Sequence, residues 1–165
     1  MEQIQRIICG NVNCYLISNG NYAILVDTGR EKHRQKVLDA CRPYQVRLLV
    51  LTHGHMDHAQ NAAFLSRELN CPVAMHRADL DLLKDNMSQA LSANTILGRI
   101  VLSASVNGTD LIVGDALMNM VYPTVSMLYH DRGTMLESAR KIEAFGGRNI
   151  HFGHGKSVKN RKWAS

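Results

Sequence analysis

The chain has 165 residues and a mass of 18.4 kDa, a length that suits one packed domain and is short for two. Hydrophobic residues make up 45% and charged residues 20%, which excludes disordered, collagen-like and low-complexity proteins. Apolar stretches stay well below the roughly 20 residues that span a bilayer, and the first residues lack the pattern of a secretory signal. We therefore expect a cytoplasmic protein, a single domain over 1–165, without a membrane partner.

The net charge of +5 suggests a protein that tolerates anionic small molecules. Part of this charge lies near the end of the chain, in the segment 156–162, which is more typical of a solvated tail than of a nucleic-acid patch. Aromatic residues make up only 5%, so there is little material for stacking on bases. A nucleic-acid partner is not expected, and RNA binding remains a minor alternative. The four cysteines form no CxxC pair and are expected to be reduced and mostly buried.

The first third of the chain predicts strands separated by short turns. The turn formers Gly10-Asn11 and Asn19-Gly20-Asn21 are so closely spaced that we expect an antiparallel meander. A helix should follow and end before Pro43, and then a nearly continuous apolar run predicts a strand covered on both faces. The expected elements are strands at Ile4–Cys9, Cys14–Ser18 and Ala23–Val26, a helix at Glu31–Cys41 and a strand at Val46–Leu51.

The rest of the chain alternates predicted helices and strands. Helical spacing of apolar residues is clearest directly after residue 58 and again before the pair Gly146-Gly147, which should end the later helix. The expected elements are helices at Ala59–Leu69, Ala78–Lys84 and Thr134–Phe145, and strands at Pro72–Met75, Leu111–Val113 and Asn149–Phe152.

Three of the eight histidines fall within six positions, in the segment Thr52–His58. His53, His55 and His58, with Asp57 among them, directly follow the predicted buried strand. Such a loop gains no hydrophobic burial, and its imidazoles would repel one another if protonated, whereas imidazole and carboxylate are good ligands for zinc. In extended backbone, residues i and i+2 project to one side, so His53 and His55 can hold one ion together. A polar loop with incidental histidines is the alternative.

Two later segments place a further carboxylate and imidazole at the ends of predicted strands. Asp115 follows Gly114, and His154 stands between Gly153 and Gly155. Alone, each motif is common and uninformative. Together with H-x-H-x-D-H, in this order, they indicate a metal site.

This combination resembles the metallo-β-lactamase superfamily. The resemblance covers most of the chain, and H-x-H-x-D-H is its most specific part. It implies an α/β fold of four layers, an αββα sandwich with two mixed sheets and outer helices. The matching segments are Asn13–Ile17, Ile24–Gly29, Thr52–His58, Val113–Leu117 and Gly153–Gly155.

The resemblance also implies roles for individual residues. His53 and His55 would hold a first divalent metal ion, while Asp57, His58 and His154 would hold a second. Asp115 would bridge the two ions. Asp27 would orient an imidazole or structure the loop behind the ligands, although a turn-forming Asp-Thr-Gly is an equally good interpretation.

The chain departs from the family in one respect. Relatives supply a third histidine to the first metal from a segment before the bridging Asp, but here no histidine lies between His76 and His130. We therefore expect that a stretch near Ser103–Asn107 is missing, either through a deletion or because the sequence leaves residues out. We predict a well-filled second metal site and a first site that is only partly filled, because it keeps His53, His55 and Asp115 alone.

The predicted function is a metal-dependent hydrolase that cleaves an ester, thioester or lactone of a small molecule. A divalent ion, most simply zinc, with manganese or iron as alternatives, would lower the pKa of a bound water, and Asp57 would orient the resulting hydroxide and accept its proton. Two alternatives stay open, a metal-binding pseudoenzyme and an iron-dependent oxidoreductase on the same fold. Lys156 could meet a substrate carboxylate, although a solvated tail lysine is the preferred interpretation.

Overall fold

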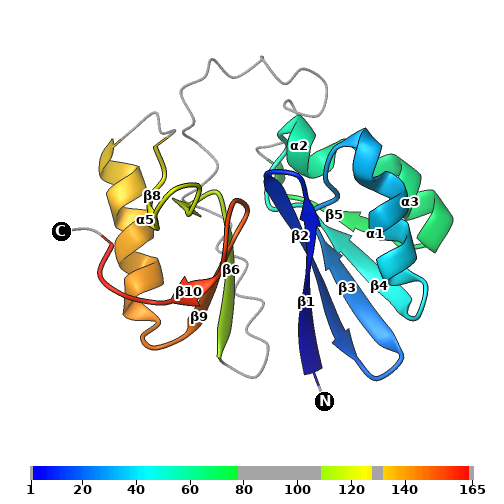
Figure 1. Cartoon of the computed structure of the whole chain (residues 1–165), viewed down its shortest axis with the longest axis horizontal. Helices are drawn as coiled ribbons and strands as arrows, with labels where there is room; N and C mark the ends of the chain where they lie inside the picture. The colour runs from blue at the N-terminus through cyan, green and yellow to red at the C-terminus, as the bar shows by residue number, and fades with distance from the viewer. Residues whose placement is uncertain (1, 78–108, 128–131, 164–165) are drawn as a thin grey trace. The chain divides into compact units, whose positions relative to one another are not determined.

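The structure is a computed structural model, and it describes residues 2–77, 109–127 and 132–163. The chain divides into two compact units, Met1–Asn86 and Met87–Ser165. Each unit contains its own β-sheet with helices, coloured blue to green in the first unit and yellow to red in the second (Figure 1). The predicted helix at 78–84 and the gap expected near 103–107 lie outside the described residues.

The first unit begins with the predicted antiparallel meander. Its strands are β1 (Glu2–Cys9), β2 (Val12–Asn19) and β3 (Tyr22–Val26), joined by two-residue connections. Gly10 and Gly20 stand in these connections with φ of 76° and 60°. Two-residue hairpins require such left-handed backbone, which glycine adopts without strain. The two glycines therefore fix the register of the meander.

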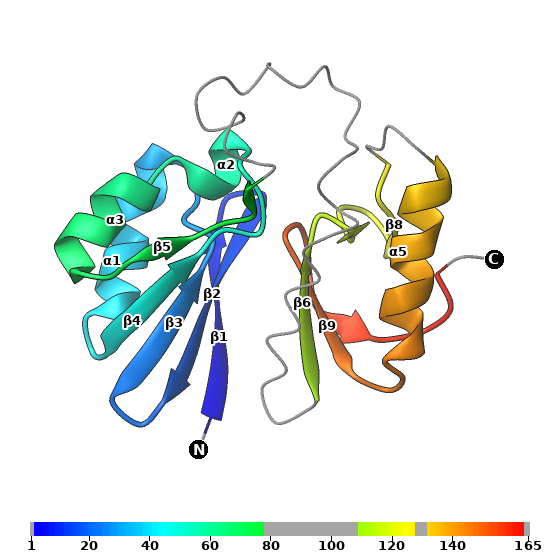
Figure 2. The same ribbon diagram turned by 180° about the vertical axis from the view of Figure 1, so that it is seen from behind.

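The rest of the first unit adds two parallel strands through helical crossovers. The sheet order is β1-β2-β3-β4-β5, with β4 parallel to both of its neighbours. The helices α1 and α3 cover one face of this sheet, as the views from two sides show (Figures 1 and 2). Leu25, Leu49 and Leu65 are completely buried in the core that results. The added elements are η1 (Glu31–His33), α1 (Arg34–Cys41), β4 (Gln45–Val50), α2 (Met56–Ala59), α3 (Ala62–Leu69) and β5 (Val73–Ala74).

Two helices differ from their predicted limits. The segment predicted as a helix from residue 31 opens with the 3₁₀ turn η1, and α-helix begins only at Arg34. The helix predicted over 59–69 begins only at Ala62, as α3, after a separate short helix α2 that ends at Ala59. At the break, Asn61 leaves helical geometry, with ψ near 4°, and its side-chain amide donates to three carbonyl groups of another loop. The spacing of apolar residues could not show that Asn61 binds another loop and interrupts the helix.

The second unit is built around a three-stranded sheet with the order β10-β9-β6. β6 and β9 are parallel, and β10 returns antiparallel to β9. Ile142, Phe152 and Leu111 are completely buried, and Trp163 lies edge-on to Phe152 with ring centres 6.1 Å apart. The elements are β6 (Asp110–Gly114), β7 (Leu117–Met118), β8 (Thr124–Val125), α5 (Arg132–Ala144), β9 (Asn149–Phe152) and β10 (Val158–Lys159).

The α/β fold class with two mixed sheets is confirmed. The short strands β7, β8 and β10 were not predicted, because a strand of two residues is too short to show an alternation of apolar and polar residues. None of the helices in the described ranges is both long and apolar enough to cross a bilayer.

Candidate metal centre

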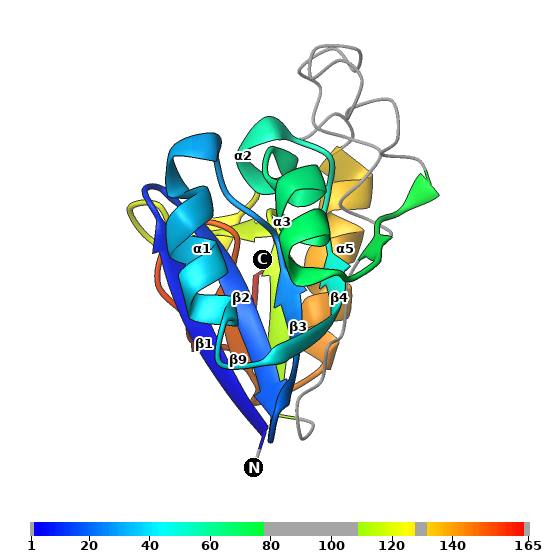
Figure 3. The same cartoon turned by 90° about the vertical axis from the view of Figure 1, so that its right-hand side faces the viewer.

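Asp27 and the histidine loop meet because β3 and β4 are parallel neighbours that end at the same edge of the sheet (Figure 3). The backbone N–H of Asp27 donates to the Val50 carbonyl at 2.8 Å. Thr52, the second residue after β4, donates from its backbone N–H to Asp27 Oδ1 at 2.8 Å and from its hydroxyl to Oδ2 at 2.8 Å. Asp27 has a φ of 59°, a left-handed conformation that aspartate tolerates better than most residues. The carboxylate is thereby turned toward the start of the histidine loop.

The same carboxylate contacts a predicted metal ligand. Asp27 Oδ2 lies 2.8 Å from His58 Nδ1, and both side chains are almost completely buried, with exposures of 2% and 0%. A carboxylate at Nδ1 fixes the tautomer and the ring orientation, and it leaves Nε2 as the nitrogen that can coordinate an ion. Asp27 therefore both shapes a turn and orients an imidazole, the two roles that the sequence left open.

Backbone contacts also fix the position of His58. Its carbonyl accepts hydrogen bonds from the Thr28 backbone N–H at 2.8 Å and from the Thr28 hydroxyl at 2.7 Å. The Asn61 side-chain amide in turn donates to the carbonyls of Thr28, Gly29 and Arg30 at 2.8–2.9 Å. Thr28 and Asn61 thus tie the loop after β3 to the start of α3. Sequence reasoning missed both residues, since neither carries a signal of its own.

The three imidazoles of the loop are packed together within the first unit. The ring centres of His53 and His55 are 4.7 Å apart with the rings nearly perpendicular, and those of His53 and His58 are 4.1 Å apart. Two imidazoles on one zinc ion, with Zn–N distances of about 2.1 Å, have ring centres on the order of 5 Å apart. The His53–His55 separation fits this arrangement. His53 and His58 are buried and His55 is half-buried.

Asp57 lies in the first turn of α2 and is half-buried. It stands on the same short segment as the three histidines, so the first unit holds the predicted carboxylate beside the predicted imidazoles. The donor set of the loop, three imidazole rings and one carboxylate, suits zinc and other divalent ions.

In the second unit, Asp115 and His154 come together for the same topological reason as Asp27 and Thr52. The parallel strands β6 and β9 end side by side, and Gly153 N–H donates to the Gly114 carbonyl at 2.8 Å. His154 Nε2 lies 3.3 Å from Asp115 Oδ2. Two ligand atoms that each lie about 2.1 Å from one zinc ion at a tetrahedral angle are about 3.4 Å apart. These two side chains therefore have the spacing of ligands that share one ion.

A close backbone approach fixes the loop that carries His154. A Cβ atom added at Gly155, where φ is 94°, would lie 1.7 Å from the Asn119 carbonyl oxygen. The Asn119 backbone N–H donates to the His154 carbonyl at 3.1 Å, and its side-chain amide donates to the Lys156 carbonyl at 2.6 Å. Any side chain at position 155 would therefore clash with Asn119, which explains why a glycine follows His154. The sequence motif alone did not show this. The Lys156 side chain is exposed.

Each predicted ligand therefore belongs to one of two local groups. The first unit gathers His53, His55 and His58, with Asp57 on the same loop, and the second unit pairs Asp115 with His154. That the two groups share metal ions is an expectation from the family resemblance.

A second polar network in the second unit was not predicted. His151 Nε2 lies 2.8 Å from Asp110 Oδ1, and His151 Nδ1 lies 2.8 Å from the Ser157 hydroxyl. Burial raises the pKa of the Asp110 carboxyl, but hydrogen bonds from Thr109, His151 and Asn149 outweigh it, so the net pKa lies below its usual value. The network ties β6 and β9 to the segment that follows His154.

The four cysteines are buried and free, as predicted. The Cys9 and Cys14 sulfurs are 3.8 Å apart, and this contact raises the pKa of Cys14 while it lowers that of Cys9. Burial raises the pKa of Cys41 to about 12 and also raises that of Cys71. Three of the four thiols are therefore held in the neutral form, which is a poor nucleophile.

Comparison with known proteins identifies a family for the part of the chain that carries the histidine loop. The family model described as the metallo-β-lactamase superfamily matches residues 7–99, more than half of the chain. The match includes the histidine loop and Asp27. Asp115 and His154 lie beyond it.

One curated relative carries the name of an enzyme. The hydroxyacylglutathione hydrolase of Anaeromyxobacter dehalogenans is 32% identical over 88 residues, which are 53% of this chain and 34% of that protein. For an uncharacterised protein of Aquifex aeolicus the matched segment is 36% of the relative. The matched part thus corresponds to about a third of the length of these relatives.

Solved structures share the fold over nearly the whole chain. A B3 metallo-β-lactamase, BLEG-1, has a TM-score of 0.73 with 17% identity and covers 95% of this chain and 94% of its own. TTHA1623, solved in a di-iron-bound form, has a TM-score of 0.70 with 19% identity and covers 96% and 98%. With the family model and the fold in agreement, the chain belongs to the metallo-β-lactamase superfamily.

Proposed function

We propose that the chain is a metal-dependent hydrolase that cleaves an ester, thioester or lactone of a small molecule. The observation that carries the proposal is the buried Asp27–His58 contact behind a cluster of three imidazoles. A carboxylate that fixes the tautomer of a buried histidine is the usual support of a metal-binding imidazole.

In this proposal the two local groups share their ions. His53, His55 and Asp115 would hold one divalent cation, and Asp57, His58, His154 and Asp115 would hold the other. When bound, such cations lower the pKa of water toward neutrality and polarise an ester or thioester carbonyl.

The chain's own residues would position the metal-binding imidazole and accept the proton of the attacking water. Asp27 keeps His58 in the tautomer with Nδ1 toward the carboxylate, and Thr52 keeps that carboxylate in place. Asp57, half-buried in the first turn of α2, would accept the proton of the attacking water. Three of the four buried thiols are in surroundings that disfavour the thiolate, and the proposal includes no covalent intermediate.

A hydrolysis panel tests the proposal. The chain is loaded with zinc, manganese or iron, and hydrolysis of a hydroxyacylglutathione thioester, a lactone, an aryl ester and a β-lactam is followed. Iron is included because the neighbour TTHA1623 was solved with iron, and oxygen consumption is recorded with it. We expect metal-dependent turnover of at least one carbonyl substrate.

Matched histidine variants make the result specific. His58→Ala should lower kcat/KM by about 100-fold or more, whereas His33→Gln, a change to a histidine outside the predicted ligand set, should lower it less than threefold. Turnover that survives His58→Ala, or a protein that binds metal and is silent on every substrate, would contradict the proposal. The second outcome would favour the pseudoenzyme.

A further inference from the structure

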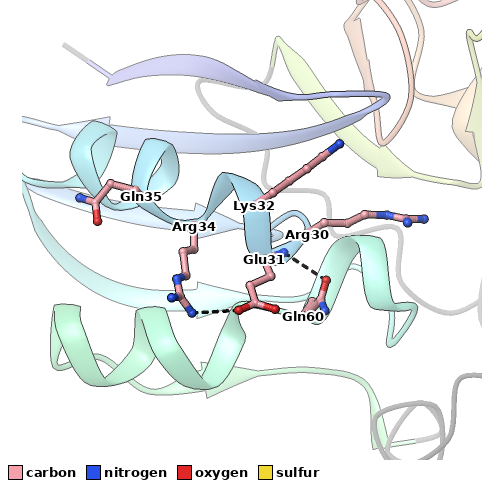
Figure 4. A pocket seen from close by; sticks show the side chains of 6 residues that line it. All are labelled: Arg30, Glu31, Lys32, Arg34, Gln35 and Gln60. Atoms are coloured by element: carbon pink, nitrogen blue, oxygen red, sulfur yellow. Dashed lines mark hydrogen bonds and ion pairs between the residues drawn. The ribbon is translucent and has the colours of Figure 1, made fainter.

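A basic cavity opens in the first unit next to the loop that follows Asp27. Its volume is about 570 Å³, within the range of small-molecule sites. Figure 4 shows the six side chains that line it, which are three cations, one carboxylate and two amides. We call it the basic cavity, lined by Arg30, Glu31, Lys32, Arg34, Gln35 and Gln60.

Two of the three cations have no partner among the residues that the structure describes. Arg34 contacts Glu31 at 3.3 Å and also lies over the Phe64 ring, 4.9 Å from its centre. Arg30 and Lys32, in contrast, make no ion pair or side-chain hydrogen bond with any residue that the structure describes. In Figure 4 their side chains extend away from α1 in the same general direction. Two exposed cations on the same short segment favour the approach of an anion.

The neighbours of these cations offer a further donor and a positive field. Gln60 Oε1 accepts the Glu31 backbone N–H at 3.1 Å, which leaves the Gln60 NH₂ group as a donor. Burial lowers the pKa of His33, and the charges of Lys32 and Lys36 lower it further. This response of His33 indicates a positive potential around the start of α1.

The cavity is tied to the histidine loop by backbone contacts. Gln60 stands two residues after His58, and Arg30 stands three residues after Asp27. The Asn61 amide donates to the Arg30 carbonyl at 2.8 Å, so the same side chain that braces the loop also fixes the edge of the cavity. The segments that line the cavity therefore adjoin, in sequence, the segments that carry the residues of the proposed chemistry.

We infer that the basic cavity binds an oxyanion, a carboxylate or phosphate group, of the substrate, an inference that rests on the proposed hydrolase. Arg30 and Lys32 supply the charge, and the Gln60 amide supplies a hydrogen bond. Because every residue of the lining ends in a charged or amide group, the cavity favours a hydrophilic anionic end over an acyl chain. Substrates of this kind are anionic esters or thioesters.

A binding test does not depend on hydrolysis. Inorganic phosphate is titrated into the ¹⁵N-labelled full chain at low salt, and shifts of backbone amide signals are followed by NMR. We expect saturable shifts at residues 30–35 and 60, and about tenfold weaker binding in the double variant Arg30→Gln, Lys32→Gln. Arg42→Gln is the matched control, since Arg42 is an exposed cation paired with Asp39 in the same unit. Equal weakening in the control, or shifts spread over all basic segments, would overturn the inference.

A substrate test identifies the source of the anion. Matched thioesters with a carboxylate, a phosphate or a neutral amide at the far end are compared in the wild type and the double variant. The double variant should lower kcat/KM about tenfold more for the anionic substrates than for the neutral one, and the more strongly affected substrate names the preferred group. An equal loss for all three would overturn the inference. Silence on all three with saturable phosphate binding would count against thioester hydrolysis and leave the anion site standing.

Discussion

The two units hold their predicted ligands by different means. In the first unit the histidine loop is fixed by side chains, since Asp27 and Thr28 contact His58 at 2.8 and 2.7 Å and the Asn61 amide holds Thr28 in place at 2.9 Å. In the second unit Asp115 and His154 are fixed by backbone, because they follow paired parallel strands and because Gly155 lies against Asn119. The first arrangement should be sensitive to the loss of polar atoms, and the second to the addition of bulk.

The largest effect is expected from added bulk in the second unit. Gly155→Ala places a Cβ 1.7 Å from the Asn119 oxygen at a φ of 94°. Overpacking and left-handed strain together should lower the free energy of unfolding by about 4 kcal/mol. Urea unfolding followed by the fluorescence of Trp163, the only tryptophan, measures it. Gly147→Ala, with open space around the new Cβ, should change stability by less than about 0.5 kcal/mol. Equal stability of the two variants would refute the role given to Gly155.

The next largest effect is expected from a lost carboxylate in the first unit. Asp27→Ala leaves the Thr52 N–H, the Thr52 hydroxyl and His58 Nδ1 without their buried partner. The free energy of unfolding should fall by about 3 kcal/mol, measured by the same urea titration. Asp27→Asn keeps the shape and an acceptor, so it should lose less than half of that. A loss below about 0.5 kcal/mol for Asp27→Ala would show that the side chains do not hold this loop.

Alkaline pH should distinguish the two units, because all four cysteines belong to the first. The pKa of Cys41 is raised to about 12 in the folded state. A raised pKa means that the neutral thiol stabilises the fold fully below the unfolded pKa, and that this stability is lost as pH rises from about 9 toward 12. Unfolding free energy should fall by roughly 1.4 kcal/mol between pH 8 and 10 through this group. Cys41→Ala should flatten this slope. An unchanged slope would exclude Cys41 as its source.

The smallest effect is expected from Asp110 in the second unit. Its pKa is lowered in the folded state, so its stabilising contribution is present above the unfolded pKa and is lost as pH falls through the folded value. Asp110→Asn should cost about 1 kcal/mol at pH 7 and make stability less dependent on pH below 4. Thermal unfolding at pH 3, 4 and 7 measures this. A variant with the pH dependence of the wild type would contradict the assignment.

The same contrast explains how much could be predicted from the sequence. The meander and the strand before residue 52 follow from turn residues and apolar runs. The spacing of His53, His55 and His58 predicts a metal-binding loop. Asn61 and Ser157 could not be predicted, because their roles depend on which distant atoms the sheet brings within 3 Å. The sequence showed Gly155 only as part of the Gly-His-Gly motif. The need for glycine there comes from the close approach of Asn119, which the sequence does not show.

The sequence likewise could not decide between the two roles of Asp27. A left-handed turn and an imidazole contact both fit Asp-Thr-Gly, and parallel pairing of β3 with β4 makes the two roles compatible. The basic cavity was missed for a related reason. In the sequence Arg30 and Lys32 look like ordinary surface charges. Only the structure shows that Gln60, from another element, lines the same cavity.

The central proposal is that the histidine loop and the Asp115–His154 pair bind shared divalent ions. Its most direct test is the metal content of the wild type and of three variants. After dialysis against trace zinc, mass spectrometry of the metal should give one firmly held ion per wild-type chain and a second at partial occupancy. His58→Ala and His154→Ala should each lose the firm ion, and His33→Gln should keep it. A wild type without bound metal, or a firm ion that survives both ligand variants, would contradict the account.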